Sequence, residues 1–255
     1  TYKGHRTEGL AEKPEAEQIR FDKFQNDYRH ELPKFCDALG LRYLGVEGVE
    51  FDDLGSILAH KVNSKVLIVS DDHDLQQIVL AMPKKVRQFF TRDYKLIAPL
   101  DITEIERGVK NKGAFLMKKC LLGDSGDGIK KLIQFGKVAY DDWFEEFKDS
   151  DYTKDEWRGI FIEVAQSKPK YKLPSGYPVV NFAQLFDLNW ALGETMTGYQ
   201  HLNKDEIVAY QLCMTKDLHK DIDEYRRLMK VHGYTAKSEF GDLQDPPDLE
   251  YLYGN

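Results

Sequence analysis

The chain has 255 residues, of which 42% are hydrophobic and 31% charged, a composition typical of a folded protein with room for a buried core. Its aliphatic runs last only four residues, as in Val66 to Val69, whereas a membrane-spanning helix needs about 18, so the sequence predicts no membrane span. The three cysteines, Cys36, Cys120 and Cys213, lie far apart. This spacing disfavours a disulfide scaffold or a cysteine zinc site and predicts a cytoplasmic protein.

The formal net charge of −7 hides a segregation of charge along the chain. Residues 84–95 carry five basic residues against one acid, residues 107–137 carry eight against two, and residues 47–74 hold seven acids. Basic stretches beside an acidic one suit a phosphate-binding surface around a metal site, although ordinary solvated faces would produce the same counts. The residues that we predict to bind nucleic acid are Lys84, Lys85, Arg92, Lys118, Lys119, Lys130 and Lys131.

Hydrophobic periodicity predicts alternating helices and strands over the first hundred residues. The apolar run of residues 65–70 is typical of a strand buried on both faces of a parallel sheet. Pro33 is expected to kink or restart the first helical region, and Gly40 to end it. The alternation predicts an α/β fold with a mainly parallel central sheet and flanking helices. In chain order, the expected elements are one or two helices over 11–39, a strand over 41–46, a helix over 52–62, a strand over 65–70, a helix over 75–80 and a strand over 86–90.

After residue 100 the pattern becomes helical, so we expect an α/β domain over residues 1–100 and a mostly α-helical domain over residues 101–255. A loop with three prolines is expected over 168–178, and a partly extended tail after Gly241. The expected helices cover 101–109, 114–122, 138–147, 157–166, 182–192 and 204–229.

Three acidic motifs carry the functional argument: Glu50-Phe51-Asp52-Asp53, Asp71-Asp72-His73-Asp74 and Asp124-Ser125-Gly126-Asp127. The first two follow expected strands, and ligands of α/β sheets bind at the carboxyl ends of the strands. Two like charges about 4 Å apart repel by about 4 kcal/mol, so such groups must bind cations or take up protons. Oxygen ligands favour Mg²⁺ or Mn²⁺, and two such ions can catalyse phosphodiester hydrolysis. Taken singly, each motif is more typical of a capped helix start in a solvated loop.

In order and spacing, these motifs resemble those of the structure-specific 5′-nucleases, the flap endonuclease and 5′–3′ exonuclease family, in its bacteriophage and bacterial members. Tyr2-Lys3-Gly4-His5-Arg6 is similar to a Tyr-Lys-x-x-Arg segment at the base of that family's helical arch, and Thr91-Arg92-Asp93-Tyr94 is similar to a phage segment after the third strand. The resemblance covers residues 1–140. It implies a PIN-like nuclease core, an arch over residues 11–39 for a single-stranded 5′ end, and a helical DNA-binding region with a helix–three-turn–helix-like segment.

The resemblance also implies roles for individual residues. Lys3 matches a catalytic lysine that contacts the scissile phosphate, and Arg6 matches a neighbouring phosphate-binding arginine. Such cationic groups stabilise charge on phosphoryl oxygens. The implied ligands of two Mg²⁺ or Mn²⁺ ions are Glu50, Asp52, Asp53 and Asp72 for the first ion, and Asp72, Asp74, Asp124 and Asp127 for the second, some of them acting through water.

The sequence departs from the family in three places. The family has two further metal-binding aspartates on strands upstream of the Tyr-Lys segment, and we expect residues 1–255 to be the downstream part of a longer protein that supplies them beside residues 65–70. Asp71 and His73 replace the residues that usually flank the acids of the second motif, and His73 is expected to be an exposed loop histidine. After Asp127, only Gly136 matches the family's Gly-rich potassium-binding segment, which leaves a K⁺ site undecided.

We therefore predict a metal-dependent 5′-nuclease that cuts branched or 5′-ended DNA in replication or repair, with RNA–DNA primers as further substrates, in a bacterial or phage-infected cell. One alternative is a PIN-type ribonuclease on the same core. The other is a non-catalytic protein that binds DNA junctions. The sequence leaves open the oligomeric state and the balance between exonuclease and flap endonuclease activity.

Overall fold

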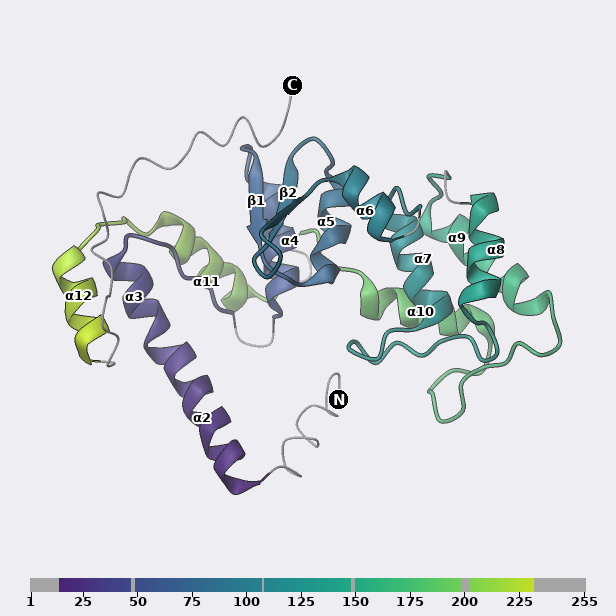
Figure 1. Ribbon diagram of the computed structural model, residues 1–255, viewed down its shortest axis with the longest axis horizontal. Helices are drawn as coiled ribbons and strands as arrows, with labels where there is room; N and C mark the ends of the chain where they lie inside the picture. The colour runs from purple at the N-terminus through teal and green to yellow at the C-terminus, as the bar shows by residue number, and fades with distance from the viewer. Residues whose placement is uncertain (1–13, 47–48, 107, 148–149, 199–201, 232–255) are drawn as a thin grey trace. The chain divides into compact units, whose positions relative to one another are not determined.

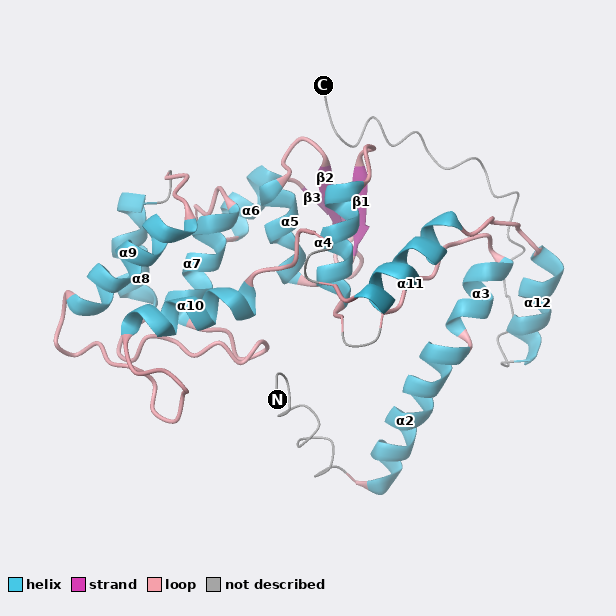
Figure 2. Ribbon diagram, turned by 180° about the vertical axis from the view of Figure 1, so that it is seen from behind, coloured by secondary structure: helices cyan, strands magenta, loops and turns pink. Residues whose placement is uncertain are grey.

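The structure is a computed structural model in which helices dominate and one small sheet lies among them (Figure 1, Figure 2). The chain forms two compact units, one of Asp52–Thr197 and one of the described parts of residues 14–51 and 198–231. Each unit is considered by itself below. The residues that the structure describes are 14–46, 49–106, 108–147, 150–198 and 202–231.

The sheet of the first unit has three strands in the order β1 (Val66–Val69), β2 (Val86–Phe90) and β3 (Lys95–Ile97). β1 and β2 are parallel, whereas β2 and β3 are antiparallel. The sheet is therefore small and mixed, and the expectation of a mainly parallel central sheet is not confirmed. β3 is missing from the predicted elements because three residues are too few for a period to be recognised.

The helices of this unit follow the predicted ones closely, with ends that differ by a few residues. α5 packs against β2, and α7 packs against α5, α8, α9 and α10. In Figure 1 the strands lie beside α4 and α5, and α6 leads from them to the group of α7, α8, α9 and α10. The bounds are α4 (Phe51–Lys61), the 3₁₀-helix η1 (His73–Leu75), α5 (Gln76–Ala81), α6 (Pro99–Ile105), α7 (Lys112–Leu122), α8 (Lys137–Phe147), α9 (Lys154–Gln166) and α10 (Phe182–Gly193).

One hydrophobic core runs through the whole unit. Ile97 lies before the predicted domain boundary at residue 100 and Ile102 after it, yet both are fully buried in the same core as Phe161 and Phe186. Burying such side chains contributes about 1.5–3 kcal/mol each. The predicted boundary at residue 100 is therefore not a structural division, because the sheet and the helices after it share one core.

The second unit contains α2 (Glu15–His30), α3 (Leu32–Ala38), α11 (Lys204–Thr215) and α12 (Ile222–Val231). The break before Pro33 is confirmed, since α2 ends at His30 and proline lies in the first turn of α3. The single helix expected over 204–229 is two helices. Residues between them pair with the end of α3, where the amide of Asp221 donates to the carbonyl of Ala38 at 2.8 Å.

The strand expected over residues 41–46 is wrong, because this segment has no regular structure. Its groups bond with α11 and the residue that follows it instead of with a neighbouring strand. The side chain of Arg42 donates to the carbonyls of Cys213 and Lys216, and Cys213 Sγ donates to the carbonyl of Tyr43 at 3.2 Å. The first acidic motif therefore does not follow a strand of the sheet.

Several predicted features lie outside the described residues. These are Lys3 and Arg6, and the tail after Gly241. Among the helices that the structure describes, none combines the length and the apolar character needed to cross a membrane.

Candidate metal centre

A tight loop after α7 holds two aspartates of the third acidic motif. α7 ends at Leu122, and the next residue, Gly123, has a φ of +75°, a conformation that favours glycine. A Cβ there would also lie 2.7 Å from the backbone nitrogen of Lys131, so the chain can turn back only with glycine at this position. Two backbone hydrogen bonds between Asp124 and Ile129, of 2.8 and 2.9 Å, then close the loop. Asp127 lies at its tip and is only 8% exposed.

The second acidic motif places Asp74 on the short η1 helix, directly after β1. Asp72 caps this helix, since its carboxylate accepts from the amide of Asp74 at 3.0 Å. Asp71 ties the end of β1 to the turn before β3, because its carboxylate accepts from the Thr91 hydroxyl at 2.6 Å and the Arg92 amide at 3.0 Å. These hydrogen bonds lower the pKa of Asp71. Two acids of this motif, Asp71 and Asp72, thus stabilise the local backbone. The carboxylate of Asp74 takes no part in these hydrogen bonds.

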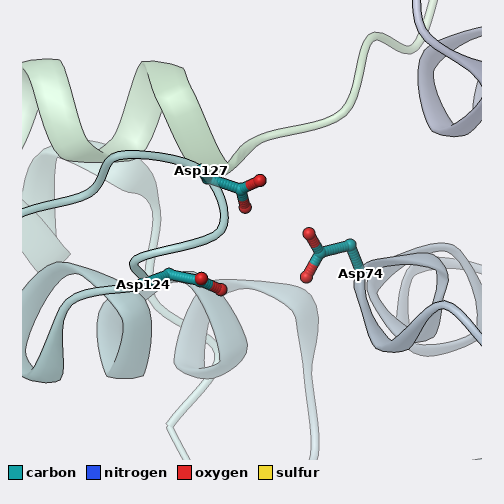
Figure 3. Close-up of side chains that lie close together, drawn as sticks. All are labelled: Asp74, Asp124 and Asp127. Atoms are coloured by element: carbon teal, nitrogen blue, oxygen red, sulfur yellow. The ribbon is translucent and has the colours of Figure 1, made fainter. Parts of the chain in front are cut away.

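The side chains of Asp74, Asp124 and Asp127 converge from these two segments (Figure 3). One carboxylate oxygen from each lies within 4.8 Å of the others. Among the residues that the structure describes, this is the one group of three acidic, histidine or cysteine side chains close enough to hold a metal ion. The donors are all carboxylate oxygens, which suits Mg²⁺ or Mn²⁺ better than zinc.

Lys119 of α7 lies among these carboxylates and is 9% exposed. Its ammonium group forms ion pairs with Asp74, with Asp124 at 3.1 Å and with Asp127 at 2.9 Å. A cation therefore already lies among the three oxygens, where it offsets part of their mutual repulsion. The residues fit a divalent cation on this ground.

The charges in the cluster do not balance, because three acids share one ammonium group. Burial raises the pKa of Asp74 to about 6, and neighbouring Asp127 adds to this, against the opposing effect of Lys119. Burial by itself would lower the pKa of Lys119, but the charges and hydrogen bonds of the aspartates outweigh it and raise that pKa. The cluster therefore keeps a surplus of acid that further positive charge would neutralise.

The structure does not bring Glu50, Asp52, Asp53 or Asp72 into the group of Asp74, Asp124 and Asp127. Asp53, for instance, accepts a hydrogen bond of 2.7 Å from the backbone amide of Met196, just after α10. Asp72 is exposed. The assignment of these four residues to a first metal ion stays a prediction.

The predicted nucleic-acid ligands fall into three groups by exposure. Lys85 and Lys118 are half-buried, and their ammonium groups donate to the carbonyl of Val62 and to Glu106. Lys119 faces the acidic cluster and not the solvent. The side chains of the other four, Lys84, Arg92, Lys130 and Lys131, are exposed. His73 is exposed as expected, with its ring 5.1 Å from that of Phe90.

The sequence did not predict that Lys119 lies in the acidic cluster, because it stands in the basic run of residues 107–137. On a helix, Lys119 follows Phe115 by four residues and Leu116 by three, and both of these residues are buried. Lys118 follows buried Ala114 and Phe115 at the same spacings, so the pattern indicates a lysine on an apolar face but does not say which of the two it is.

Comparisons with known proteins agree with the resemblance drawn from the motifs. No protein-family model matches the chain. Over 108 residues, 41% of the chain, it is 31% identical to a 5′–3′ exonuclease of Buchnera aphidicola subsp. Schizaphis graminum. The chain covers only 36% of that relative's length.

The fold is similar to that of solved bacteriophage T5 structures. One is a T5 protein co-crystallised with metal ions, matched with a TM-score of 0.53 and 19% identity over 90% of this chain and 78% of the other. Another is the T5 flap endonuclease in a pseudo-enzyme-product complex with DNA and metal ions, with a TM-score of 0.51 and 20% identity over 91% of this chain and 77% of the other. At this identity the likeness shows the fold.

Proposed function

We propose that the protein is a divalent-metal-dependent 5′-nuclease that hydrolyses phosphodiester bonds of branched or 5′-ended DNA, with RNA–DNA primers as further substrates. The observation that carries this proposal is the convergence of Asp74, Asp124 and Asp127 around a buried ammonium group. The fold match to the T5 nuclease, whose structures hold metal ions and DNA, supports it.

In this proposal the three converging aspartates hold one Mg²⁺ or Mn²⁺ ion. A second ion is assigned to Glu50, Asp52, Asp53 and Asp72, on the strength of the motif resemblance. Bound divalent ions supply an activated water and stabilise the leaving oxygen of a phosphodiester. The aspartates' own task is to hold positive charge at a fixed place beside the end of β1.

DNA binding is assigned to the exposed basic residues, and phosphate contact at the scissile bond to Lys3 and Arg6. The exposure of Lys84, Arg92, Lys130 and Lys131 supports the first assignment, because a solvent-exposed cation can reach a phosphate. Lys130 and Lys131 directly follow the loop that carries Asp124 and Asp127, so a bound backbone would run close to the metal centre.

The test is cleavage of a labelled 5′ flap in Mg²⁺, with blunt duplex and single-stranded DNA as controls. Wild-type protein should cut the flap or the 5′ end, and a chelator should stop it. Asp127→Asn should slow cleavage about 10³-fold, which corresponds to about 4 kcal/mol of lost transition-state stabilisation. The matched control is Asp187→Asn, since Asp187 pairs with Arg158 away from the cluster.

The same substrates separate the alternatives. Binding to the flap without cleavage in Mg²⁺ or Mn²⁺ would make the protein a junction-binding protein. Cleavage confined to RNA would make it a ribonuclease. Full activity in folded Asp127→Asn protein would contradict the metal assignment.

A further inference from the structure

Lys119 occupies the position in which a metal ligand set would place its ion. Its ammonium group contacts all three carboxylates that can reach a common point, and the residue is almost completely buried. A surface lysine would swing into solvent when a divalent ion arrives. Here such a movement is restricted, because the residue is only 9% exposed.

The stem of Lys119 lies near two further residues. A Cβ built on Gly193, at the end of α10, would lie 3.5 Å from Lys119 Cδ, which is an ordinary van der Waals distance. The ammonium nitrogen lies 5.8 Å from the centre of the Phe115 ring. Because Lys119 is only 9% exposed, its neighbours limit the directions in which the charge can move away from the carboxylates.

Fixed positive charge has opposite effects on the two states of the cluster. Without a metal ion it offsets the mutual repulsion of Asp74, Asp124 and Asp127, and so stabilises the fold. With a divalent ion among the same oxygens, it lies within a few ångströms of that ion and opposes its binding. One residue can thus protect the empty centre and weaken its affinity.

We propose that Lys119 is an internal cation that competes with a divalent metal ion for the carboxylates of Asp74, Asp124 and Asp127. The inference rests on the metal assignment made in the proposed function, and it goes further in naming a residue that sets occupancy. Lys119 is a positioning residue in this role, since it acts on the carboxylates and not on a substrate.

The experiment measures Mn²⁺ binding to the full chain by electron paramagnetic resonance of the free ion, together with thermal unfolding in a chelator and in Mn²⁺. Lys119→Met keeps the length and apolar contacts of the stem and removes the charge. We expect its dissociation constant for Mn²⁺ to fall at least tenfold. Its unfolding midpoint in the chelator should fall, and the rise on adding Mn²⁺ should exceed that of wild type.

Lys118→Met is the matched control, because the neighbouring lysine pairs with Glu106 outside the cluster. It should bind Mn²⁺ as wild type does. Adding Asp127→Asn to Lys119→Met should abolish the gain in affinity, which locates the ion at this cluster. If Lys119→Met unfolds in the chelator, recovery of a cooperative transition in Mn²⁺ supports the proposal, and failure to recover contradicts it.

Unchanged or weaker Mn²⁺ binding by folded Lys119→Met would overturn the inference, since Lys119 would then help to build the centre. The outcome is separable from that of the proposed function. If Lys119→Met binds Mn²⁺ more tightly but the wild-type protein does not cut DNA, the competition is supported and the nuclease proposal is rejected. If the wild-type protein cuts DNA but Lys119→Met does not bind Mn²⁺ more tightly, the nuclease proposal is supported and the competition is rejected.

Discussion

Gly113 in the first turn of α7 lies against the fully buried indole of Trp157 from α9. A Cβ at this position would overlap the indole nitrogen, whereas a Cβ on Gly159, in α9 itself, would meet nothing within 4 Å. We therefore expect Gly113→Ala to lower the free energy of unfolding by about 1–3 kcal/mol through overpacking. Gly159→Ala should raise it by about 0.5–1 kcal/mol, because alanine loses less backbone entropy in a helix.

Urea unfolding of the two variants beside wild type measures both effects. The two variants carry the same residue change on neighbouring helices, but Gly159 is exposed, so opposite signs separate the effect of packing from that of helix propensity. Equal stabilisation by both substitutions would mean that α7 and α9 do not pack as closely as the structure has them.

At the level of single residues, the sequence is informative about acids and less so about their counter-charge. Asp74, Asp124 and Asp127 are all among the residues predicted to bind metal, because carboxylates cluster in motifs that a reader can see. Lys119 is predicted to bind nucleic acid, since it stands in a basic run. Its ion pair with Asp74 joins residues 45 positions apart, and only the packing of α7 against α5 brings them together.

The start of α9 is a capping box between Thr153 and Glu156. The Glu156 carboxylate accepts from the Thr153 hydroxyl and amide, both at 2.7 Å, while the amide of Glu156 donates to the hydroxyl at 3.4 Å. The hydroxyl and then the amide lower the pKa of Glu156 below its usual 4.5. A depressed carboxyl pKa stabilises the fold above the pKa of the unfolded chain, and this stabilisation is lost as the pH falls.

We therefore expect wild type to lose more stability than Glu156→Gln when the pH is lowered below the usual glutamate pKa. Thermal midpoints measured on either side of that pKa compare the two proteins. Glu163→Gln, which changes an exposed glutamate of the same helix, should retain the wild-type slope. If all three slopes coincide, the capping box does not contribute to stability in solution.

At the level of elements, prediction succeeds where local signals decide the outcome. The helices from α7 to α11 are 11 to 13 residues long, about three turns, and Pro33 marks a real break. The prediction of a strand over residues 41–46 fails. Their apolar alternation is typical of a strand, but the side chain of Arg42 and the thiol of Cys213 hold them against α11. Partners about 170 residues away carry no local signature.

For the whole molecule, the net charge of −7 repels DNA, so the proposed DNA binding must depend on local basic segments. Replacing exposed Lys130 and Lys131 together with alanine should weaken duplex binding. The slope of log K against log salt should shrink by about 1–2 units, because fewer counterions are released. Fluorescence anisotropy with a labelled duplex, in an Asp127→Asn background that prevents cutting, measures the slope.

The matched control replaces Lys168 and Lys170, two exposed lysines that lie over the ring of Tyr171. This variant has the same net charge as the first. A difference in slope between the two variants therefore reflects the position of the lysines and not the total charge. If the variant without Lys130 and Lys131 kept the slope of the protein that retains them, these two lysines would lie away from the DNA.

The absence of a side chain at Gly193 has a consequence for how the protein can vary. A Cβ at this position would lie 3.2 Å from Ile129 Cδ1 and 3.5 Å from the side chains of Leu116 and Lys119, so alanine would meet Ile129 first and a larger residue would also press on the Lys119 stem. A bulkier residue at position 193 would push the stem of Lys119 aside and move the ammonium group relative to the three acids. Natural variation at a position in α10 could therefore retune the acidic cluster through volume alone, while every ionisable group in it stays the same.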